Sequence, residues 1–153
     1  MEPKIQSFID DLHGKYVSLI SMVPKKKDNV PNDSPEGGIY MFSEGNRNLY
    51  VGRTKRKIKD RLKDHISRAD DCPFAWLIAR EKTGETKASY KQSGSRKNLL
   101  SRPYFKSAYE EAKKQIREMD IRYVGENNPI KQALLEIYVA VVANAKYNDF
   151  NTH

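Results

Sequence analysis

The sequence is poor in cysteine and in long apolar segments, and both shortages limit what the protein can be. Cys72 is the only cysteine among 153 residues, which excludes a disulfide framework and a cysteine-rich zinc module. No apolar run approaches the roughly 20 residues that a membrane-spanning helix needs. The first residues, MEPKIQSFIDDL, lack the apolar core of a secretory signal. We therefore expect a cytoplasmic protein without a membrane segment.

Acidic residues are scarce relative to basic ones. The chain has 28 lysines and arginines against 20 aspartates and glutamates, so its net charge is +8. Seven of the cations and only two of the acids fall between Arg80 and Arg102. Because lysine and arginine replace phosphate counterions, this surplus favours a nucleic-acid partner. A basic protein with an ordinary solvated surface is the alternative.

The spacing of hydrophobic residues predicts the secondary structure of the first part of the chain. Apolar residues at helical intervals indicate a helix over residues 3–21. The proline-rich stretch PKKKDNVPNDSPEGG that follows is typical of an irregular arm. Two short aromatic and β-branched segments, 38–43 and 48–52, are separated by EGNR and predict an antiparallel hairpin.

Helices and one strand are expected after the hairpin. Residues 55–69 look helical, with Thr54 as the N-cap, and PFAWLIA in the mixed stretch 70–100 fits either a helix or a strand. A helix opens at Ser101 and Pro103, a strand covers 119–125, and a last helix runs from Asn128-Pro129 to about residue 145. This order predicts an α/β (α+β) fold on a small antiparallel sheet.

One carboxylate stands out in the last helix. In QALLEIYVAVVANA, residues 132–145, Glu136 is the only charged side chain, and apolar residues cover nearly every direction around the axis. Such a helix is predicted to be buried, and a buried carboxylate is costly unless it is paired, hydrogen-bonded or bound to a metal. Glu136 would therefore pair with Arg61 or a similar cation, point outward at an edge of the fold, or bind a hard divalent cation.

Arg61 and His65 lie four residues apart and would share one face of the helix over 55–69. A solvated basic face is the ordinary explanation. A phosphoryl-transfer site would use the arginine to bind phosphate and the histidine to position water or to donate to an oxyanion.

Tyr40 and Tyr50 would project from one face of the hairpin, either as packing residues or as catalytic phenols. A phenol acting as general base near neutral pH needs its pKa lowered by about 3 from ≈ 10. Arg53, Arg56 and Arg61, together with a metal ion, could provide the necessary positive field.

The ordered pattern resembles the GIY-YIG nuclease family. Gly38-Ile39-Tyr40 is similar to its first signature, and Tyr50-Val51-Gly52 to its second, with valine in place of isoleucine. Arg53-Thr54 resembles the short tail that often follows. Six positions between residues 38 and 148 match the functional residues of the family in order: Tyr40, Tyr50, Arg61, His65, Glu136 and Asn148.

The resemblance implies a three-stranded antiparallel sheet flanked by helices and metal-dependent hydrolysis of DNA. Tyr40 would be the general base or would position the water, with Tyr50 as its hydrogen-bonded helper. Arg61 would neutralise the transition-state phosphate, and His65 would assist at the nucleophile. Glu136 would hold one Mg²⁺ or Mn²⁺ ion, and Asn148 would bind the phosphate or order the site.

Two segments lie outside the resemblance: an N-terminal helix and arm over 1–36, and a basic insertion at about 70–102 within a catalytic domain over 37–153. We interpret them as DNA-recognition or dimer elements, although a solvated loop fits the insertion equally well. The predicted DNA contacts are Arg53, Arg56, Tyr90, Lys91, Arg96 and Lys97.

The preferred hypothesis is a stand-alone endonuclease of double-stranded DNA, most similar to a type II restriction enzyme, because the chain is compact and has no appended DNA-binding domain. A palindromic target would favour a homodimer. The alternatives are a small DNA repair or mobile-element nuclease, a catalytically silent DNA-binding module, and a domain that binds acidic proteins.

Overall fold

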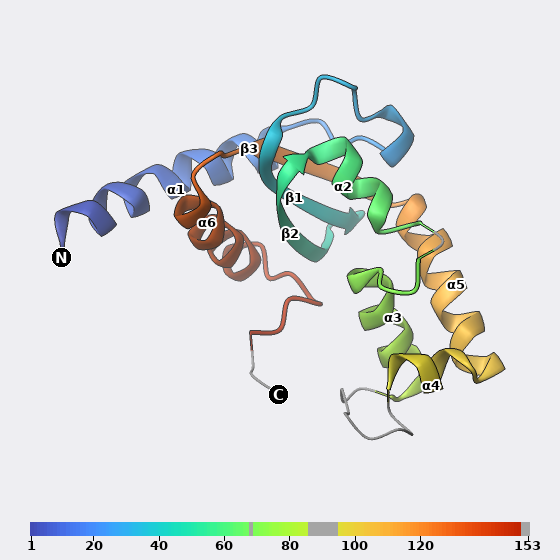
Figure 1. Cartoon of the computed structure of the whole chain (residues 1–153). Helices are drawn as coiled ribbons and strands as arrows, with labels where there is room; N and C mark the ends of the chain where they lie inside the picture. Colours follow the sequence, from blue (N-terminus) through green and yellow to red (C-terminus); the bar gives the residue numbers. More distant parts are fainter. Residues whose placement is uncertain (68, 86–94, 151–153) are drawn as a thin grey trace. The chain divides into compact units, whose positions relative to one another are not determined.

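The computed structural model describes residues 1–67, 69–85 and 95–150, which fall into two compact units (Figure 1). Unit 1 comprises Met1–Leu62 and Met119–Asn148, and unit 2 contains Lys63–Glu118. The predicted division into an arm over 1–36 and a catalytic domain over 37–153 stays a prediction. No helix within the described ranges combines the length and apolar composition needed to cross a membrane.

Unit 1 is a three-stranded antiparallel sheet with helices packed on it. Its elements are α1 (Pro3–Ser21), a short 3-10 turn (Lys27–Asn29), β1 (Glu36–Glu44), β2 (Arg47–Lys57), β3 (Asp120–Gly125) and α6 (Pro129–Val142). The strand order is β2-β1-β3, and both neighbouring pairs are antiparallel. The predicted fold class is therefore confirmed, and β2 lies at an edge of the sheet.

Side chains along β1 alternate between the two faces of this sheet. Ile39 and Met41 join the apolar core that α1 and α6 form with Val51 of β2. Because neighbouring side chains on a strand point to opposite faces, Tyr40 and Phe42 lie on the other face. The sheet thus places its central tyrosine away from the core that anchors the strand.

The last helix begins as the sequence predicts but is not buried on all sides. The Asn128 side chain accepts hydrogen bonds from the backbone N–H groups of residues 130 and 131, and Pro129 occupies the first turn. Leu135 and Val139 are buried, whereas Ile137 and Val141 are 47% and 66% exposed. The expectation of a helix buried all round was therefore wrong, because α6 packs against its neighbours on one side only.

The second strand is longer than predicted, and the following helix is shorter. Gly38 pairs with Thr54 and, after a register shift, Glu36 pairs with Lys57, so β1 and β2 stay paired well beyond Gly52. Helix α2 (Ile58–Asp64) consequently starts at Ile58 rather than at residue 55. Thr54 is a strand residue and not a helix cap, which corrects the sequence-based interpretation.

Unit 2 contains α3 (Pro73–Thr83), α4 (Arg96–Leu100) and α5 (Pro103–Arg117). The ambiguous PFAWLIA segment is helical: Pro73 opens α3, and Gly84, with φ +81°, ends it. The residues predicted to face inward from α5 are all buried: Phe105, Ala108, Ala112 and Ile116. Phe105 packs against Trp76 of α3, with 5.1 Å between the ring centroids.

Candidate active site

Tyr40 fits into a space that a glycine leaves open on the neighbouring strand. It is fully buried and lies opposite Gly52 in the β1–β2 register. A methyl group on Gly52 would overlap both the hydroxyl and the ring of Tyr40. The ring also packs edge-on against Phe42, with centroids 5.9 Å apart. The glycine of Tyr50-Val51-Gly52 is therefore required to accommodate the tyrosine of the first motif.

The glycine of the first motif has a similar steric role on the other side of β1. A methyl group on Gly38 would overlap the carbonyl oxygen of Val124 on β3. Gly38 pairs directly with Gly125 in the β1–β3 register. Close approach of these two strands therefore depends on the missing side chain, and it fixes the strand from which Tyr40 projects.

Arg61 of α2 joins the two tyrosines into one cluster. Its guanidinium donates a hydrogen bond to the Tyr40 hydroxyl. Burial raises the pKa of Tyr40, the Tyr50 phenol raises it further, and Arg61 opposes both effects without cancelling them. Burial likewise raises the pKa of Tyr50 against the field of Arg61. Both phenols are therefore neutral at pH 7 and can hold a water molecule by hydrogen bonds.

Glu136 on α6 completes this cluster from the far end of the chain. Its carboxylate forms an ion pair with Arg53, with 3.2 Å between Nε and Oε2, and its side chain is 24% exposed. Burial raises the pKa of Glu136, and Arg53 lowers it in part. The charge of Glu136 in turn raises the pKa values of Tyr40 and Tyr50. The carboxylate thus acts electrostatically on both phenols.

The cation beside Glu136 was not identified from the sequence. Arg61 or a similar residue was considered as an ion-pair partner, and the structure places Arg53 there. Arg53 was predicted as a DNA contact instead. No local pattern could have revealed the pair, because the two residues lie far apart in the sequence and on different elements.

Asn148 holds the edge strand between the tyrosine and the glycine of the second motif. Its Oδ1 accepts a hydrogen bond from the N–H of Val51 at 2.8 Å, and its Nδ2 donates to the carbonyl oxygen of Val51 at 2.8 Å. The side-chain amide thereby acts as an additional strand partner for β2. Of the two roles implied for Asn148, this geometry fits the ordering of the site.

The remaining predicted residues differ in burial and in the unit to which they belong. His65 is fully buried and belongs to unit 2. It directly follows the end of α2 at Asp64, and its role beside Arg61 stays a prediction. Arg56 on β2 and Arg96 and Lys97 on α4 are exposed. Two predicted contacts, Tyr90 and Lys91, lie outside the described residues.

A comparison with protein families shows which family the chain belongs to. The model of the GIY-YIG catalytic domain matches residues 36–148, which is most of the chain. The chain belongs to the GIY-YIG nuclease family. It is accordingly a nuclease that acts on DNA. No curated protein and no solved structure matched the chain in the corresponding searches.

Glu136 is the carboxylate of the cluster that could serve as a metal ligand in this GIY-YIG domain. No group of three or more histidine, cysteine or acidic side chains suited to a metal occurs among the described residues. A magnesium ion in proteins is commonly held by one or two carboxylates, with water and substrate phosphate supplying its other ligands. The half-buried Glu136, beside two neutral phenols, fits such a ligand.

Proposed function

We propose that the protein is a Mg²⁺- or Mn²⁺-dependent endonuclease of the type II restriction class. The observation that supports it is the electrostatic coupling of Tyr40, Tyr50, Arg61 and Glu136 within unit 1. A protein that only binds DNA needs no half-buried carboxylate next to buried phenols. The same observation therefore favours a cleaving enzyme over a silent DNA-binding module.

Each residue of the cluster has a chemical role in this proposal. Arg61 presents a planar guanidinium to the scissile phosphate and neutralises charge as it builds up in the transition state. Tyr40 stays a neutral phenol and holds the attacking water by a hydrogen bond, and Tyr50 orients it. Asn148 keeps β2 in place, so that Tyr50 and Gly52 remain in register with β1.

The metal ion of this proposal is assigned to Glu136. When bound, it would supply positive charge to the phosphate and to the leaving oxygen. The ion pair with Arg53 would hold the Glu136 carboxylate in position beforehand. Arg53 is 47% exposed, so its side chain is free to turn toward the DNA backbone once a cation takes its place. This would reconcile its ion pair with the predicted DNA contact.

Restriction and repair enzymes differ in the DNA fragments they produce, which the cleavage experiment distinguishes. The catalytic assistance of His65 and the homodimer expected for a palindromic target both stay predictions. Loss of cleavage in His65→Ala with retained DNA binding would support the first, and the molar mass in solution measures the second.

The deciding experiment is cleavage of plasmid and genomic DNA with Mg²⁺, Mn²⁺ or EDTA. The wild type is compared with Glu136→Ala and with Glu44→Gln, whose carboxylate also pairs with an arginine on the same sheet, Arg47, at 2.9 Å. Discrete metal-dependent fragments, lost in Glu136→Ala and kept in Glu44→Gln, would support the proposal. Nicking or smearing would favour the repair or mobile-element alternative. Binding without cleavage under any metal would refute the enzyme.

A further inference from the structure

Two arginines of unit 2 lie against one aromatic ring. Trp76, the only tryptophan of the chain, is 2% exposed and is fixed between Phe105 and Tyr109, with 5.1 Å between ring centroids in each case. The guanidinium carbon of Arg80 lies 5.5 Å from the centroid of the Trp76 ring, and that of Arg96 lies 5.2 Å from it. Both distances are in the range of cation–π contacts. One rigid indole thus holds two like charges together.

The closeness of these charges is electrostatically unfavourable in the protein alone. Burial and the charge of Arg96 both lower the pKa of Arg80, and Glu85 compensates only in part. Arg80 donates a hydrogen bond to the backbone carbonyl oxygen of Glu85 at 3.1 Å, whereas the Glu85 carboxylate pairs with Arg102 at 3.3 Å and accepts a hydrogen bond from Tyr104 at 3.0 Å. Arg96 forms no ion pair with any residue that the structure describes. An anion between the two guanidiniums would relieve their repulsion.

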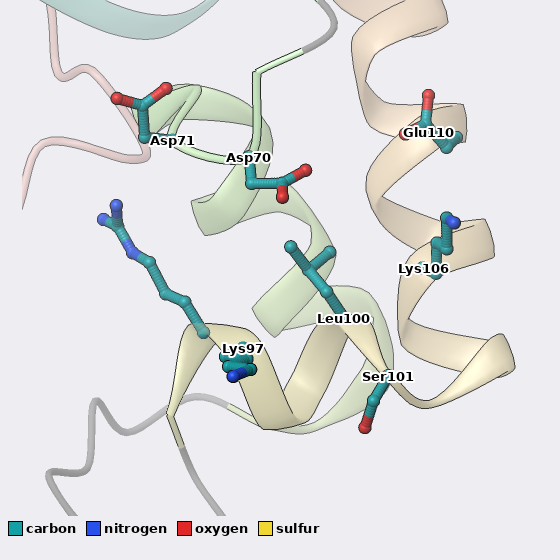
Figure 2. A pocket seen from close by; sticks show the side chains of 8 residues that line it. Asp70, Asp71, Lys97, Leu100, Ser101, Lys106 and Glu110 are labelled. Atoms are coloured by element: carbon teal, nitrogen blue, oxygen red, sulfur yellow. The ribbon is translucent and has the colours of Figure 1, made fainter.

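The neighbouring pocket does not provide that anion or bind one by itself. It has a volume of about 560 Å³. Figure 2 shows its walls, which come from the segment before α3, from α4 and from α5. Three cations and three acids line it, with Leu100 and Ser101 between them: Arg96, Lys97 and Lys106 against Asp70, Asp71 and Glu110. Arg96 belongs both to this lining and to the pair of arginines at Trp76, so the pocket has no surplus of positive charge of its own.

We propose that Arg80 and Arg96 of unit 2, held on Trp76, bind phosphates of the DNA backbone. The inference rests on the proposed function, because it takes the substrate to be double-stranded DNA. Guanidinium groups bind phosphate in a bidentate manner, and indole packing restricts their motion before DNA arrives. Phosphate contacts fix the register of a protein on DNA without reading its sequence. Arg96 was predicted as a contact, whereas Arg80 emerges only from the fold.

The test measures binding of a fluorescently labelled DNA duplex in EDTA over a series of salt concentrations. The variants are Arg96→Gln, the double variant Arg80→Gln/Arg96→Gln, and Arg117→Gln as a control at the last residue of α5. Each lost phosphate contact should reduce the slope of log K against log salt by about 0.9. Each should also weaken binding on the order of tenfold, as for the loss of a charged hydrogen bond. Arg117→Gln should match the wild type.

The fluorescence of Trp76 gives a second readout. DNA would not change this fluorescence if the two arginines had only a structural role. Because Trp76 is the only tryptophan, a change in emission on adding unlabelled duplex reports on this site. We expect the wild-type emission to change and that of the double variant to stay constant. Arg80→Lys/Arg96→Lys should keep the salt slope, because the charges remain, but bind more weakly, because the planar fork is lost. If the double glutamine variant fails to fold, Arg96→Gln, at an exposed residue, and the lysine variant provide the test.

The outcomes separate this inference from the proposed function. If the wild type cleaves DNA and the double variant binds with unchanged affinity and slope, the Trp76 site is refuted and the nuclease stands. If no DNA is cleaved with any metal but the slope falls as expected, the contact stands and the restriction enzyme is refuted. Absence of DNA binding by the wild type would overturn both.

Discussion

Replacing Gly52 with alanine should disable the enzyme through sterics alone. The added methyl group overlaps the hydroxyl and ring of Tyr40, which is buried and cannot turn into solvent. Tyr40 is also held by Phe42 at 5.9 Å and by the hydrogen bond from Arg61. The strands must therefore separate, or the phenol must leave its place opposite Gly52.

The magnitude follows from the cost of overpacking. An extra methyl group in a well-packed region costs about 1–3 kcal/mol, and each kcal/mol lowers Tm by about 2–4 °C in a chain of this size. A displacement of about 1 Å at a reacting group can reduce the rate about 10²-fold. We thus expect Gly52→Ala to stay folded, with a moderately lower Tm, and to cleave DNA about 10²-fold more slowly.

The assay combines urea unfolding with plasmid cleavage at saturating metal. Gly14→Ala is the matched control, because a methyl group on Gly14 of α1 meets nothing within 4 Å and should stabilise the helix by about 0.5–1 kcal/mol. A double-mutant cycle with Tyr40→Ala isolates the overlap. The reasoning is refuted if Gly52→Ala unfolds and cleaves like the wild type, or if its stability cost persists in the Tyr40→Ala background.

Three further predictions concern stability. Asn148→Ala removes both hydrogen bonds to Val51 and should cost about 1–3 kcal/mol in urea unfolding, whereas Asn48→Ala, which loses one bond at 3.0 Å, should cost about half as much. Burial raises the pKa of Glu136 above its ordinary value of 4.5, so Glu136→Gln in EDTA should stabilise the protein at pH 7. That gain should disappear as the pH falls below 4.5; a destabilised variant at pH 7 would contradict it. Because the pKa of Tyr40 is raised above 10.0, its contribution to stability is complete below pH 10.0 and lost above it. Tyr40→Phe should therefore lose less stability than the wild type between neutral pH and pH above 10.0, as measured by urea unfolding.

Elements with strong local signals could be predicted from the sequence. The helix over Pro3–Ser21 follows from its apolar spacing, and the start of α6 follows from Asn128 and Pro129. The hairpin follows from two aromatic segments around Gly45, which adopts φ +59° in the turn. In each case the deciding interactions lie within a few residues, where spacing and capping rules apply.

Features set by contacts between distant residues could not be predicted. Residues 55–57 read as the start of a helix, but the pairing of β2 with β1 as far as Glu36 keeps them in a strand. The exposure of Val141 depends on which sides of α6 meet α1 and the sheet, which hydrophobic periodicity alone does not specify. The Arg53–Glu136 pair depends on the placement of α6 beside β2. The sequence thus indicates the candidate residues but not which side chains they contact in the fold.

The short signature of this family is a steric requirement as much as a chemical one. Gly52 leaves space for the Tyr40 ring, and Asn148 bonds both the N–H and the carbonyl oxygen of Val51, the residue between Tyr50 and Gly52. Displacement of β2 would therefore move Tyr50, which is part of that strand. It would also move Tyr40, because the space beside Gly52 that holds the Tyr40 ring would change. Substitutions at Gly52 and Asn148, which bear no reactive group, should for this reason impair cleavage together with those at the tyrosines. A chain with the phenols and Glu136 but without these two supports would hold the chemical groups without their alignment.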